Sequence, residues 1–403
     1  MKVLALTHIF PSLSAPTRGP YNHNIFKAIA RHCEVRVIVP EPWWGRVRCP
    51  QKLWKTPYEE QTGLPAIFPT FWSVPRMAPL HGRALYLSLR TSIARLRRDF
   101  PFDAILAAWA YPDAVAAEKI AREFGCPLVI KVLGSDVNAL TRSAPLRTQI
   151  VQSMQAAHCT IAVSEALRER LVEIGVPRER TLVQHNGVDG DRFTLRERNA
   201  ARAQLGLSPQ APMLCYVGRL GHEKGLDILL QAMHRLKTSG RTDIELKLVG
   251  WGECEDTLRT QARELQLEKQ VAFCGRRSHD EVPLWVSACD VLCLPSRREG
   301  CPNVVLEALA SGRPVVASRV GGVPELINAT NGILVPSEDP AALAEGIAVA
   351  LLRTWEPSAL RSTVEYLSWD AVGDAYYNKL VEAVQIRQTA TQREITSRAY
   401  EQA

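Results

Sequence analysis

Short runs of apolar residues alternate with amphipathic stretches along most of the chain. In the first half, five runs rich in Val, Leu, Ile and Ala have the length of strands: residues 2–8, 33–41, 102–110, 127–136 and 159–165. Ile25, Ala28 and Ile29 recur at helical spacing between the first two runs, and further helix-like segments lie at 113–124 and 165–174. Buried-type strands that alternate with helices predict a parallel sheet covered on both faces.

The alternation pauses over a polar, turn-rich stretch at 181–212 and then resumes. Six further strand-like runs follow: residues 213–220, 244–252, 271–276, 290–296, 313–319 and 332–336. The pattern predicts two doubly wound α/β domains, 1–190 and 191–367, facing a central cleft that suits a ligand. An amphipathic helix at about 368–390 is expected to pack back on the first domain, with a frayed polar tail beyond it.

Composition agrees with two folded domains and narrows the location of the protein. The 403 residues are 46% hydrophobic and 23% charged, a balance typical of globular proteins. No apolar run approaches the ~18 residues of a spanning helix, and the first residues do not form a signal-peptide core. We therefore expect a cytoplasmic chain. The ten cysteines form no C-x-x-C pair and the histidines no H-x-x-x-H pair, so buried free thiols are expected rather than disulfides or a metal site.

The positive charge of the chain is concentrated in its first half. Residues 1–189 hold 24 Lys/Arg and 15 Asp/Glu, whereas the whole chain has a net charge of +7. Residues 81–100 interleave five arginines with leucines and isoleucine, which suits a basic amphipathic helix on an anionic membrane, at the cytoplasmic face of the inner membrane. The alternative is an ordinary packed helix with a solvated cationic face. No nucleic-acid-binding motif accompanies the charge, so nucleic acid is not an expected partner.

Two glutamates stand eight positions apart in "SRREGCPNVVLEALASGRPVVAS", residues 296–318. The stretch predicts a strand, a loop, a helix that begins near Pro302 and a further strand. Such a unit directs the helix N-terminus toward the crevice beyond the strand ends, where an anion binds. Glu299 in the loop then suits sugar hydroxyls, and Glu307 suits a ribose diol. Alternatively, Glu299 interacts with the helix dipole and Glu307 belongs to a solvated face.

A second stretch, "GRLGHEKG" at 218–225, places two cations in a glycine-rich turn after a strand. Arg219 and Lys224, with backbone N–H groups, have the charge needed to neutralise a diphosphate. The turn is not a phosphate-binding loop of the G-x-x-x-x-G-K-[ST] type. A solvated loop is the alternative interpretation.

Together these stretches resemble the retaining family-four glycosyltransferases of the GT-B fold. The resemblance rests on six segments, which are "GRLGHEKG", "LVGWGECEDTL", "VAFCGRRSHDEVPLW", the stretch around Glu299 and Glu307, "GGVPELI" and "NGILVP". It implies transfer of a sugar from a UDP- or GDP-sugar to a hydroxyl of a glycan or lipid-linked acceptor, in exopolysaccharide, lipopolysaccharide or other cell-surface glycan synthesis. The nucleotide sugar is a substrate, and neither a cofactor nor a metal is expected.

The resemblance also assigns roles to individual residues. Arg219 and Lys224 would hold the donor diphosphate, Glu299 the transferred sugar and Glu307 the ribose. Retention is commonly explained in this family by a front-face mechanism, in which the donor phosphate helps to deprotonate the acceptor. The other implied donor contacts are Gly19, Gly218, Cys274, Gly275, Arg276, Gly300, Cys301, Pro302, Asn303 and Val304.

The first half matches the family more loosely. Where many relatives have H-G-S-D, this chain has Leu133, Gly134, Ser135 and Asp136, so the histidine is missing. Asp136 is the candidate catalytic residue on the acceptor side, and a strand-end cap is its alternative role. Leu133 also motivates the alternative function of a catalytically inactive GT-B-type module that binds glycan or membrane. The D-x-D sequence at 189–191 is interpreted as part of the inter-domain link rather than a metal motif.

Overall fold

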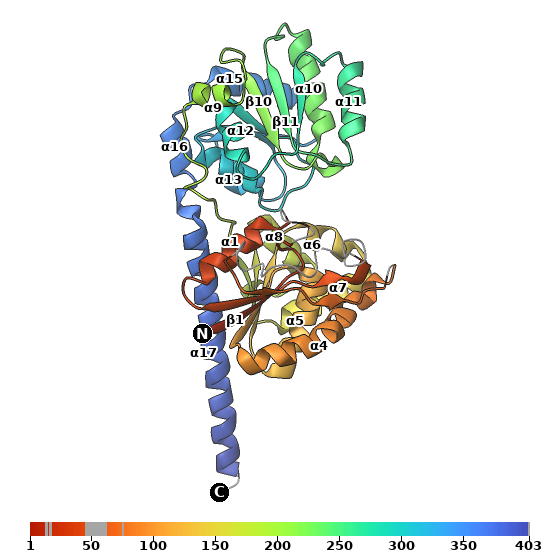
Figure 1. The fold of residues 1–403 in the computed structure, drawn as a ribbon, viewed down its shortest axis with the longest axis vertical. Helices are drawn as coiled ribbons and strands as arrows, with labels where there is room; N and C mark the ends of the chain where they lie inside the picture. Colours follow the sequence, from red (N-terminus) through yellow and green to blue (C-terminus); the bar gives the residue numbers. More distant parts are fainter. Residues whose placement is uncertain (13–14, 16–17, 45–62, 75, 402–403) are drawn as a thin grey trace. The chain divides into compact units, whose positions relative to one another are not determined.

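The computed structural model describes residues 1–12, 15, 18–44, 63–74 and 76–401. The chain forms two compact units, and Figure 1 shows their elements. Unit 1 comprises Met1–Asn186 and Trp369–Ala403, and unit 2 comprises Gly187–Ser368. The predicted limits at residues 190 and 367 lie close to these divisions.

Unit 1 is built on a seven-stranded parallel sheet with the order β4-β2-β1-β6-β7-β8-β9. The strands are β1 Lys2–Leu6, β2 Glu34–Ile38, β4 Ala66–Ile67, β6 Ala104–Ala107, β7 Leu128–Val132, β8 Cys159–Ala162 and β9 Thr181–Val183. A separate pair joins β3 (Glu41–Pro42) to β5 (Thr70–Phe71). Because β1, β6, β7 and β8 are almost wholly apolar and buried, the sheet is covered on both faces.

Helices cover both faces of this sheet. The longer ones are α1 Pro20–Ile29, α4 His81–Asp99, α5 Val115–Phe124, α7 Ala144–Ala156, α8 Glu165–Glu173 and α17 Trp369–Glu401. α17 packs beside α1, and Val372, Tyr376, Leu380 and Ala383 join the core formed by β1, β2 and β6 (Figure 1). The last helix thus returns to unit 1, and it continues to Glu401 where a frayed tail was expected beyond about 390.

Unit 2 has a six-stranded parallel sheet with the order β12-β11-β10-β13-β14-β15. Its strands are β10 Met213–Val217, β11 Glu245–Val249, β12 Val271–Gly275, β13 Val291–Leu294, β14 Val315–Ser318 and β15 Gly332–Val335. Its helices are α9 Arg198–Gln204, α10 Leu226–Thr238, α11 Glu255–Glu264, α12 Val282–Ala288, α13 Asn303–Ala310, α14 Val323–Leu326, α15 Pro340–Leu352 and α16 Pro357–Ser362. α10 and α15 pack together, and α9 packs on α12, so helices again enclose the strands.

The apolar runs identified all the long strands of both sheets, and the predicted fold class of two parallel α/β domains is confirmed. The interpretation of 181–194 as turns was wrong at its start, where β9 extends the sheet of unit 1. β9 is only three residues long and only Thr181 in it is buried, so its pattern lacks the continuous apolar run that marked the other strands.

The basic helix at 81–100 is α4, and its apolar side faces the protein. Leu85, Leu89 and Ile93 are fully buried, so this apolar side packs against the protein and is not free to enter a membrane. This agrees with the alternative interpretation of an ordinary packed helix. Within the described residues, no helix has both the length and the apolar character needed to cross a membrane. The nine cysteines that the structure describes are free thiols. Five of them are buried as predicted, whereas Cys33, Cys126, Cys254 and Cys274 are partly exposed.

Candidate functional site

The predicted donor residues of unit 2 gather where the strand order of its sheet reverses. From β10 the chain proceeds to β11 on one side, whereas β13 lies on the other side of β10. In such sheets the loops that leave the carboxyl ends of the two strands diverge and open a crevice, the usual ligand site. Lys224 ends the short turn after β10, and Glu299 lies in the loop after β13. We call this place the unit 2 switch point.

Lys224 and Glu299 form an ion pair at the unit 2 switch point. Lys224 Nζ lies 2.7 Å from Glu299 Oε1, and the Ser296 hydroxyl donates to the same oxygen at 2.7 Å. The Glu299 side chain is 8% exposed and that of Lys224 is 24% exposed, so the cation keeps the larger share of solvent contact. Burial, followed by the negative charge of Glu299, raises the pKa of the neighbouring Tyr216 phenol well above its usual value. A partly shielded ammonium beside an oriented carboxylate suits a ligand that carries both phosphate and hydroxyls.

Glycines bring the loops of this edge into backbone contact. A Cβ on Gly225, which follows Lys224, would lie 2.1 Å from the carbonyl oxygen of Pro295. A Cβ on Gly321 would lie 1.9 Å from the carbonyl oxygen of Glu299, and one on Gly250 would lie 1.7 Å from that of Gly218. Since no side chain fits at these distances, glycine is what allows the loops after β10, β11, β13 and β14 to pack together.

Gly225→Ala is expected to disrupt the unit 2 switch point. Gly225 has a φ of 63°, so alanine there meets both backbone strain and a collision with Pro295. We expect a loss of about 2–4 kcal/mol in the free energy of unfolding. Gly206→Ala is the matched control, because Gly206 has a φ of 66° but open space around it. It should cost about 1 kcal/mol in urea unfolding; equal losses in the two variants would contradict the close approach.

Arg219 is held on the surface of the same edge by a carboxylate that the sequence did not single out. Its guanidinium forms two hydrogen bonds to Glu253, from Nε at 3.0 Å and from Nη2 at 2.9 Å. A second bidentate pair, Arg297 with Asp227 at 2.8 and 2.7 Å, joins the β13 loop to the start of α10. The first pair orients Arg219, whose side chain remains exposed, whereas the second braces the loop that carries Glu299.

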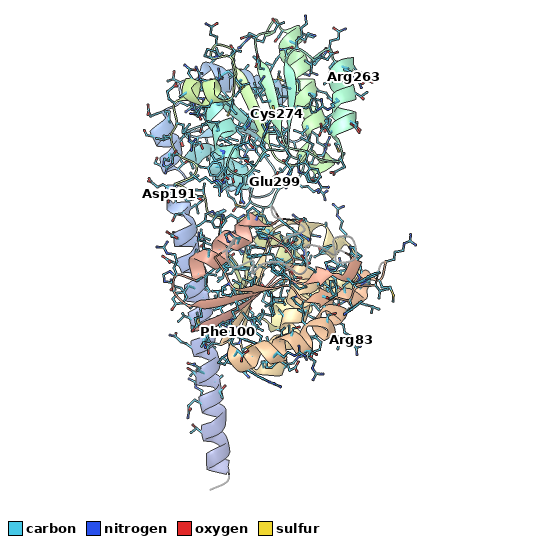
Figure 2. The ribbon with its side chains drawn as sticks, viewed as in Figure 1. Arg83, Phe100, Asp191, Arg263, Cys274 and Glu299 are labelled. Atoms are coloured by element: carbon cyan, nitrogen blue, oxygen red, sulfur yellow. The ribbon has the colours of Figure 1, made fainter. Side chains whose placement is uncertain are left out.

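The N-terminus of α13 follows Glu299 directly. Pro302 was expected in the first helical turn but is the residue before it, and the helix begins at Asn303. Pro302 makes no side-chain capping hydrogen bond, and Gly300 is tied to the β14 loop through a hydrogen bond from the N–H of Gly322 at 3.1 Å. N–H groups at a helix N-terminus attract anions. The segment from Gly300 through Cys301 to Val304 thus lies where the sequence placed a phosphate contact, and Figure 2 labels Glu299 beside it.

Glu307 lies on the next turn of α13, where the surrounding residues cover most of it. Burial raises the pKa of its carboxyl group to about 7, and the nearby Arg192 opposes that shift only in part. A carboxyl group with a pKa near neutrality marks this position as a site candidate, because an ordinary surface glutamate shows no such shift.

The raised pKa predicts a pH-dependent stability. In the unfolded chain the carboxyl of Glu307 ionises near pH 4.5, whereas in the folded protein it stays protonated until about pH 7. The folded state therefore loses stability as the pH rises through this window. At pH 8 we expect Glu307→Gln to be more stable than the parent by about 1–3 kcal/mol, and the difference to vanish near pH 4.5. Urea unfolding across this range measures it; a constant difference would contradict the shifted pKa.

The implied donor contacts Cys274, Gly275 and Arg276, which the resemblance to the family places beside the nucleobase, lie at the end of β12. Cys274 and Gly275 are partly exposed, and Figure 2 labels Cys274 within unit 2. The guanidinium of Arg276 lies 5.7 Å from the ring centroid of Trp251, whose side chain is 58% exposed. The N–H of Gly250 donates to the carbonyl oxygen of Gly275 at 3.0 Å, which joins this strand end to the loop after β11. The exposed indole of Trp251 was missed from the sequence, although "GWG" directly follows a strand.

In unit 1 the predicted acceptor residue Asp136 is fully buried. Its carboxylate accepts from the backbone N–H groups of Ala110, Leu133 and Gly134 at 3.0, 3.0 and 2.8 Å. Burial raises the pKa of this carboxyl, and those hydrogen bonds counteract the shift. In this structure Asp136 is therefore a strand-end cap, the alternative that the sequence left open. Its carboxylate has no exposed surface with which to meet an acceptor.

Two further features lie at the carboxyl edge of this sheet. Gly19 has a φ of 62°, and a Cβ there would lie 2.4 Å from the carbonyl oxygen of Ile9, so glycine is what allows the first loop to pack closely within unit 1. Its contact with the donor stays a prediction. The pair formed by His8 and Asp113 was missed. Its signal in the sequence is that each residue follows a buried strand, β1 for His8 and β6 for Asp113.

The D-x-D sequence forms a turn. The carboxylate of Asp189 accepts from the backbone N–H groups of Asp191 and Arg192 at 3.2 and 3.1 Å. Within the described part of the chain, no three His, Cys, Asp or Glu side chains gather as metal ligands. The link interpretation of 189–191 fits the hydrogen bonding that the structure shows.

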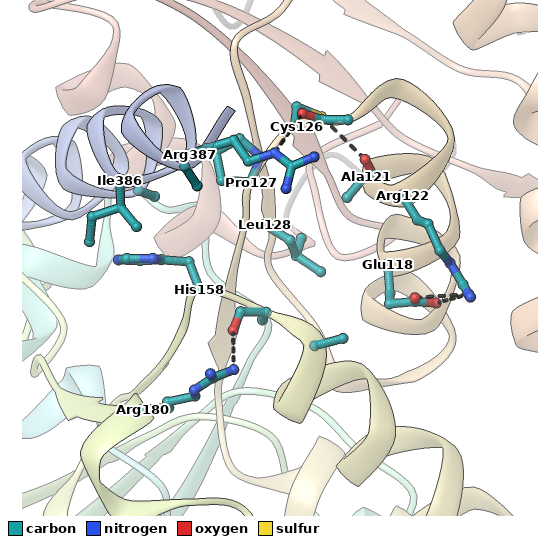
Figure 3. Close-up of a pocket in the computed structure, with 15 residues that line it drawn as sticks. Glu118, Ala121, Arg122, Cys126, Pro127, Leu128, His158, Arg180, Ile386 and Arg387 are labelled. Carbon is teal, nitrogen blue, oxygen red and sulfur yellow. Dashed lines mark hydrogen bonds and ion pairs between the residues drawn. The ribbon is translucent and has the colours of Figure 1, made fainter. Parts of the chain in front are cut away.

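A cavity of about 690 Å³ lies in unit 1 at the amino ends of its strands, the edge of the sheet opposite to that of Asp136 (Figure 3). Its walls include residues that precede β7, β8 and β9, with His158, Arg180 and Arg387 among them. Arg180 donates to the carbonyl oxygen of Gln155, and Arg387 donates to that of Gly125. None of the predicted site residues borders this cavity.

Comparison with protein families identifies the chain along nearly its whole length. Residues 197–362 match the profile described as glycosyl transferases group 1, and residues 20–192 match that described as glycosyltransferase family 4. The chain belongs to glycosyltransferase family 4. The transferase therefore has the two-domain GT-B fold, and its resemblance to this family, first apparent in the unit 2 motifs, extends through both units.

Individual relatives of the transferase agree with this assignment. It is 29% identical over 361 residues to TuaC of Bacillus subtilis (strain 168), whose name places it in teichuronic acid biosynthesis; the match covers 86% of this chain and 88% of TuaC. It is 28% identical to the amylovoran biosynthesis glycosyltransferase AmsK of Erwinia amylovora, covering 64% and 63% of the two chains. The structure of Anabaena HepE in complex with UDP and glucose has 22% identity, a TM-score of 0.69 and coverage of 98% and 100%.

Proposed function

We propose that the transferase moves a sugar from a UDP- or GDP-sugar to a hydroxyl of a glycan or lipid-linked acceptor in the synthesis of a cell-surface polysaccharide, with retention at the anomeric carbon. The observation that carries the donor part is the 2.7 Å pair of Lys224 and Glu299 at the unit 2 switch point. The names of TuaC and AmsK support the polysaccharide part, and the UDP and glucose bound by HepE support the donor class.

The geometry supports a division of labour within unit 2. Lys224, Arg219 and the N-terminus of α13 supply positive charge and N–H donors for the two phosphates. Glu299 supplies an oriented carboxylate for the sugar hydroxyls, and Glu307 supplies one for the ribose. On donor binding the phosphates compete with Glu299 for Lys224, which frees one carboxylate oxygen for the sugar. Because these cations can carry the charge of the leaving diphosphate, we propose that transfer needs no metal.

Turnover of radiolabelled nucleotide sugars tests this function. The full chain is incubated with UDP-glucose, UDP-galactose and GDP-mannose, with and without EDTA, and release of labelled sugar to water or to an added glycan is measured. We expect turnover of at least one donor that EDTA leaves unchanged. Binding of a nucleotide without any turnover would favour the inactive-module alternative, to which the comparisons lend no support.

An exposed apolar segment in unit 1 supports a peripheral contact with an anionic membrane. Trp72, Val74, Met77 and Leu80 are each 45–64% exposed, and the N–H of Trp72 donates to the Ser88 hydroxyl of α4. The adjoining α4 exposes four of its five arginines, among them Arg83, which Figure 2 labels. Apolar side chains beside cations match the boundary between lipid headgroups and acyl chains.

Trp72→Ser is expected to weaken this contact. Losing one inserted indole should lower partitioning onto phosphatidylglycerol vesicles about tenfold, and purely neutral vesicles should bind the parent protein weakly. Leu352→Ser is the control, because Leu352 of unit 2 is 80% exposed and lies outside the segment. Sedimentation with vesicles measures both variants, and equal binding of Trp72→Ser and parent would refute the contact.

A further inference from the structure

The cavity at the amino ends of the unit 1 strands is separate from the predicted donor and acceptor residues, none of which lines it. Its walls come from the segments before β7, β8 and β9 and from the helices α5, α7 and α17, all within unit 1. Its volume of about 690 Å³ falls within the range of small-molecule sites, ~300 to 1,000 Å³. The cavity is therefore a second candidate binding site, and its walls indicate what it holds.

Short apolar side chains leave this cavity unfilled. Larger apolar walls come from Leu128 and from Ile386, which is 53% exposed. An apolar group that covers such surface removes it from water, which stabilises the complex. The cavity thus suits a ligand with an apolar part. Five alanines form much of the remaining wall: Ala121 of α5, Ala156 and Ala157 at the end of α7, and Ala383 and Ala390 of α17.

Two of the three arginines that line the cavity carry a charge that no carboxylate of the described residues neutralises. Arg122 forms an ion pair with Glu118, the lining carboxylate, at 2.9 Å. Arg180 and Arg387 form no such pair within the described part of the chain, and both side chains are exposed. The lining residues therefore have an excess of positive charge.

The carboxylate of Glu382 does not remove this excess. It lies 3.9 Å from Nε2 of His158, which lines the cavity, but its own partner is Lys379 at 2.7 Å. Because Lys379 and Glu382 balance each other, the two guanidiniums remain the dominant charges of the cavity. An anion is the ligand that such charges attract.

Backbone carbonyl groups at the ends of two helices hold these arginines in place. Arg180 Nη1 donates to the carbonyl oxygen of Gln155, near the end of α7, at 2.7 Å. Arg387 Nε donates to the carbonyl oxygen of Gly125, the C-cap residue of α5, at 3.4 Å. Among the described residues no hydrogen bond engages Nη2 of Arg180 or either Nη of Arg387 (Figure 3). These N–H donors are left for phosphate oxygens, which a guanidinium binds in matching geometry.

We propose that this cavity binds an organic phosphate, whose phosphate group is held by Arg180 and Arg387 and whose apolar part contacts the alanine walls and Ile386. Inorganic phosphate would leave the apolar walls uncovered, and an uncharged ligand would leave the two guanidiniums without a counter-charge. A soluble phosphate ester and the headgroup of a lipid both present this chemistry. The inference does not depend on the proposed function, because no donor residue takes part in it.

Calorimetry of the full chain with hexyl phosphate, and separately with inorganic phosphate, tests both parts of the site. We expect hexyl phosphate to bind about tenfold or more tightly than inorganic phosphate, because only the ester buries apolar surface. Arg180→Gln/Arg387→Gln should lower the affinity for hexyl phosphate about tenfold or more, because charge-assisted hydrogen bonds are lost. Arg142→Gln/Arg147→Gln is the matched control: it removes the same charge from two exposed arginines of unit 1 that do not line the cavity, and it should keep the parental affinity.

Ala156→Leu distinguishes a binding cavity from arginines that only cap helix ends. Leucine at this exposed lining position narrows the cavity and keeps every charge, so it should weaken the binding of hexyl phosphate several-fold even if the double arginine variant fails to fold. Parental affinity for hexyl phosphate in Ala156→Leu would overturn the inference. Parental affinity in a folded Arg180→Gln/Arg387→Gln, or no binding by the parent, would also overturn it.

Vesicles distinguish the two sources of the phosphate. Sedimentation with phosphatidylcholine vesicles that contain or lack phosphatidic acid is compared between the parent and Arg180→Gln/Arg387→Gln. Loss in the variant of the binding that depends on phosphatidic acid would support the inference and identify a lipid headgroup as the ligand. Unchanged vesicle binding, together with lost affinity for hexyl phosphate, would support it and identify a soluble ester.

Discussion

Lys224→Ala should lower sugar transfer about 10²- to 10³-fold, because it removes the ammonium expected to carry the charge of the leaving diphosphate. In the structure Lys224 Nζ lies 2.7 Å from a carboxylate oxygen of Glu299. The same oxygen also accepts a hydrogen bond from the Ser296 hydroxyl. Without a ligand, the variant leaves this nearly buried carboxylate with one donor fewer, so a modest loss of stability is also expected. Steady-state turnover of a labelled donor measures the first effect and urea unfolding the second.

Lys379→Ala is the matched control for this prediction. Lys379 forms a pair with Glu382 at the same distance of 2.7 Å, on the exposed side of α17 in unit 1. If a Lys–Glu contact matters only for stability, both variants should resemble the parent in turnover. Parental kcat/KM in Lys224→Ala would remove Lys224 from the diphosphate site.

The second large effect is that replacing Glu299 and replacing Glu307, the two glutamates of the β13–α13 unit, should impair different steps. Glu299→Gln should lower kcat about 10- to 100-fold with little change in UDP affinity, since its carboxylate is assigned to the sugar rather than to the nucleotide. Glu307→Gln should weaken UDP or GDP binding about tenfold, because the ribose hydroxyls lose an ionised acceptor. Calorimetry with UDP and GDP, set beside turnover of the sugar donor, distinguishes the two roles.

The raised pKa of Glu307 gives a second way to test its contact with the ribose. Ribose hydroxyls that donate to the carboxylate favour its ionised form, so nucleotide binding near pH 7 should release a proton from the parent and none from Glu307→Gln. The enthalpy of binding in two buffers of different ionisation enthalpy reveals that proton. The reverse outcome, with Glu299→Gln defective in nucleotide affinity and Glu307→Gln defective only in transfer, would overturn the assignment.

The fold followed from the sequence because its strands are buried on both faces. Continuous apolar runs such as those of β7 and β13 identify such strands with little ambiguity. β9 was not predicted because this short edge strand has only one buried residue and so lacks a continuous apolar run. The last helix was recognised by its periodicity, but its length beyond 390 was not, since polar residues there carry no packing signal.

The donor edge of unit 2 was predictable in outline because its residues occur in two compact stretches. Which side chains meet there was not: Arg219 pairs with Glu253, and Lys224 with Glu299, across 34 and 75 positions of the chain. The role of Asp136 could not be predicted either, because it depends on tertiary structure. A carboxylate at a strand end binds backbone N–H groups or a ligand, depending on the loop that folds over it.

The pair of His8 and Asp113 shows the limit of motif-based inference most clearly. These residues are 105 positions apart, and neither lies in a recognisable signature. They meet because β1 and β6 are neighbours in the sheet, which no local pattern reveals. Parallel sheets bring together residues at the carboxyl ends of adjacent strands, so each buried strand of a predicted sheet should be searched at its final position.

The central claim, that unit 2 binds a nucleotide sugar at Lys224 and Glu299, is tested most directly by thermal unfolding in the presence of nucleotides. A ligand that binds only the folded state raises the melting temperature, by about 2.7 kcal/mol of added stability at a hundredfold excess over Kd. We expect UDP or GDP, and the corresponding sugar donor, to raise the melting temperature of the parent protein and to lose most of that effect in Lys224→Ala. No shift with any nucleotide, or an equal shift in Lys224→Ala, would contradict the account.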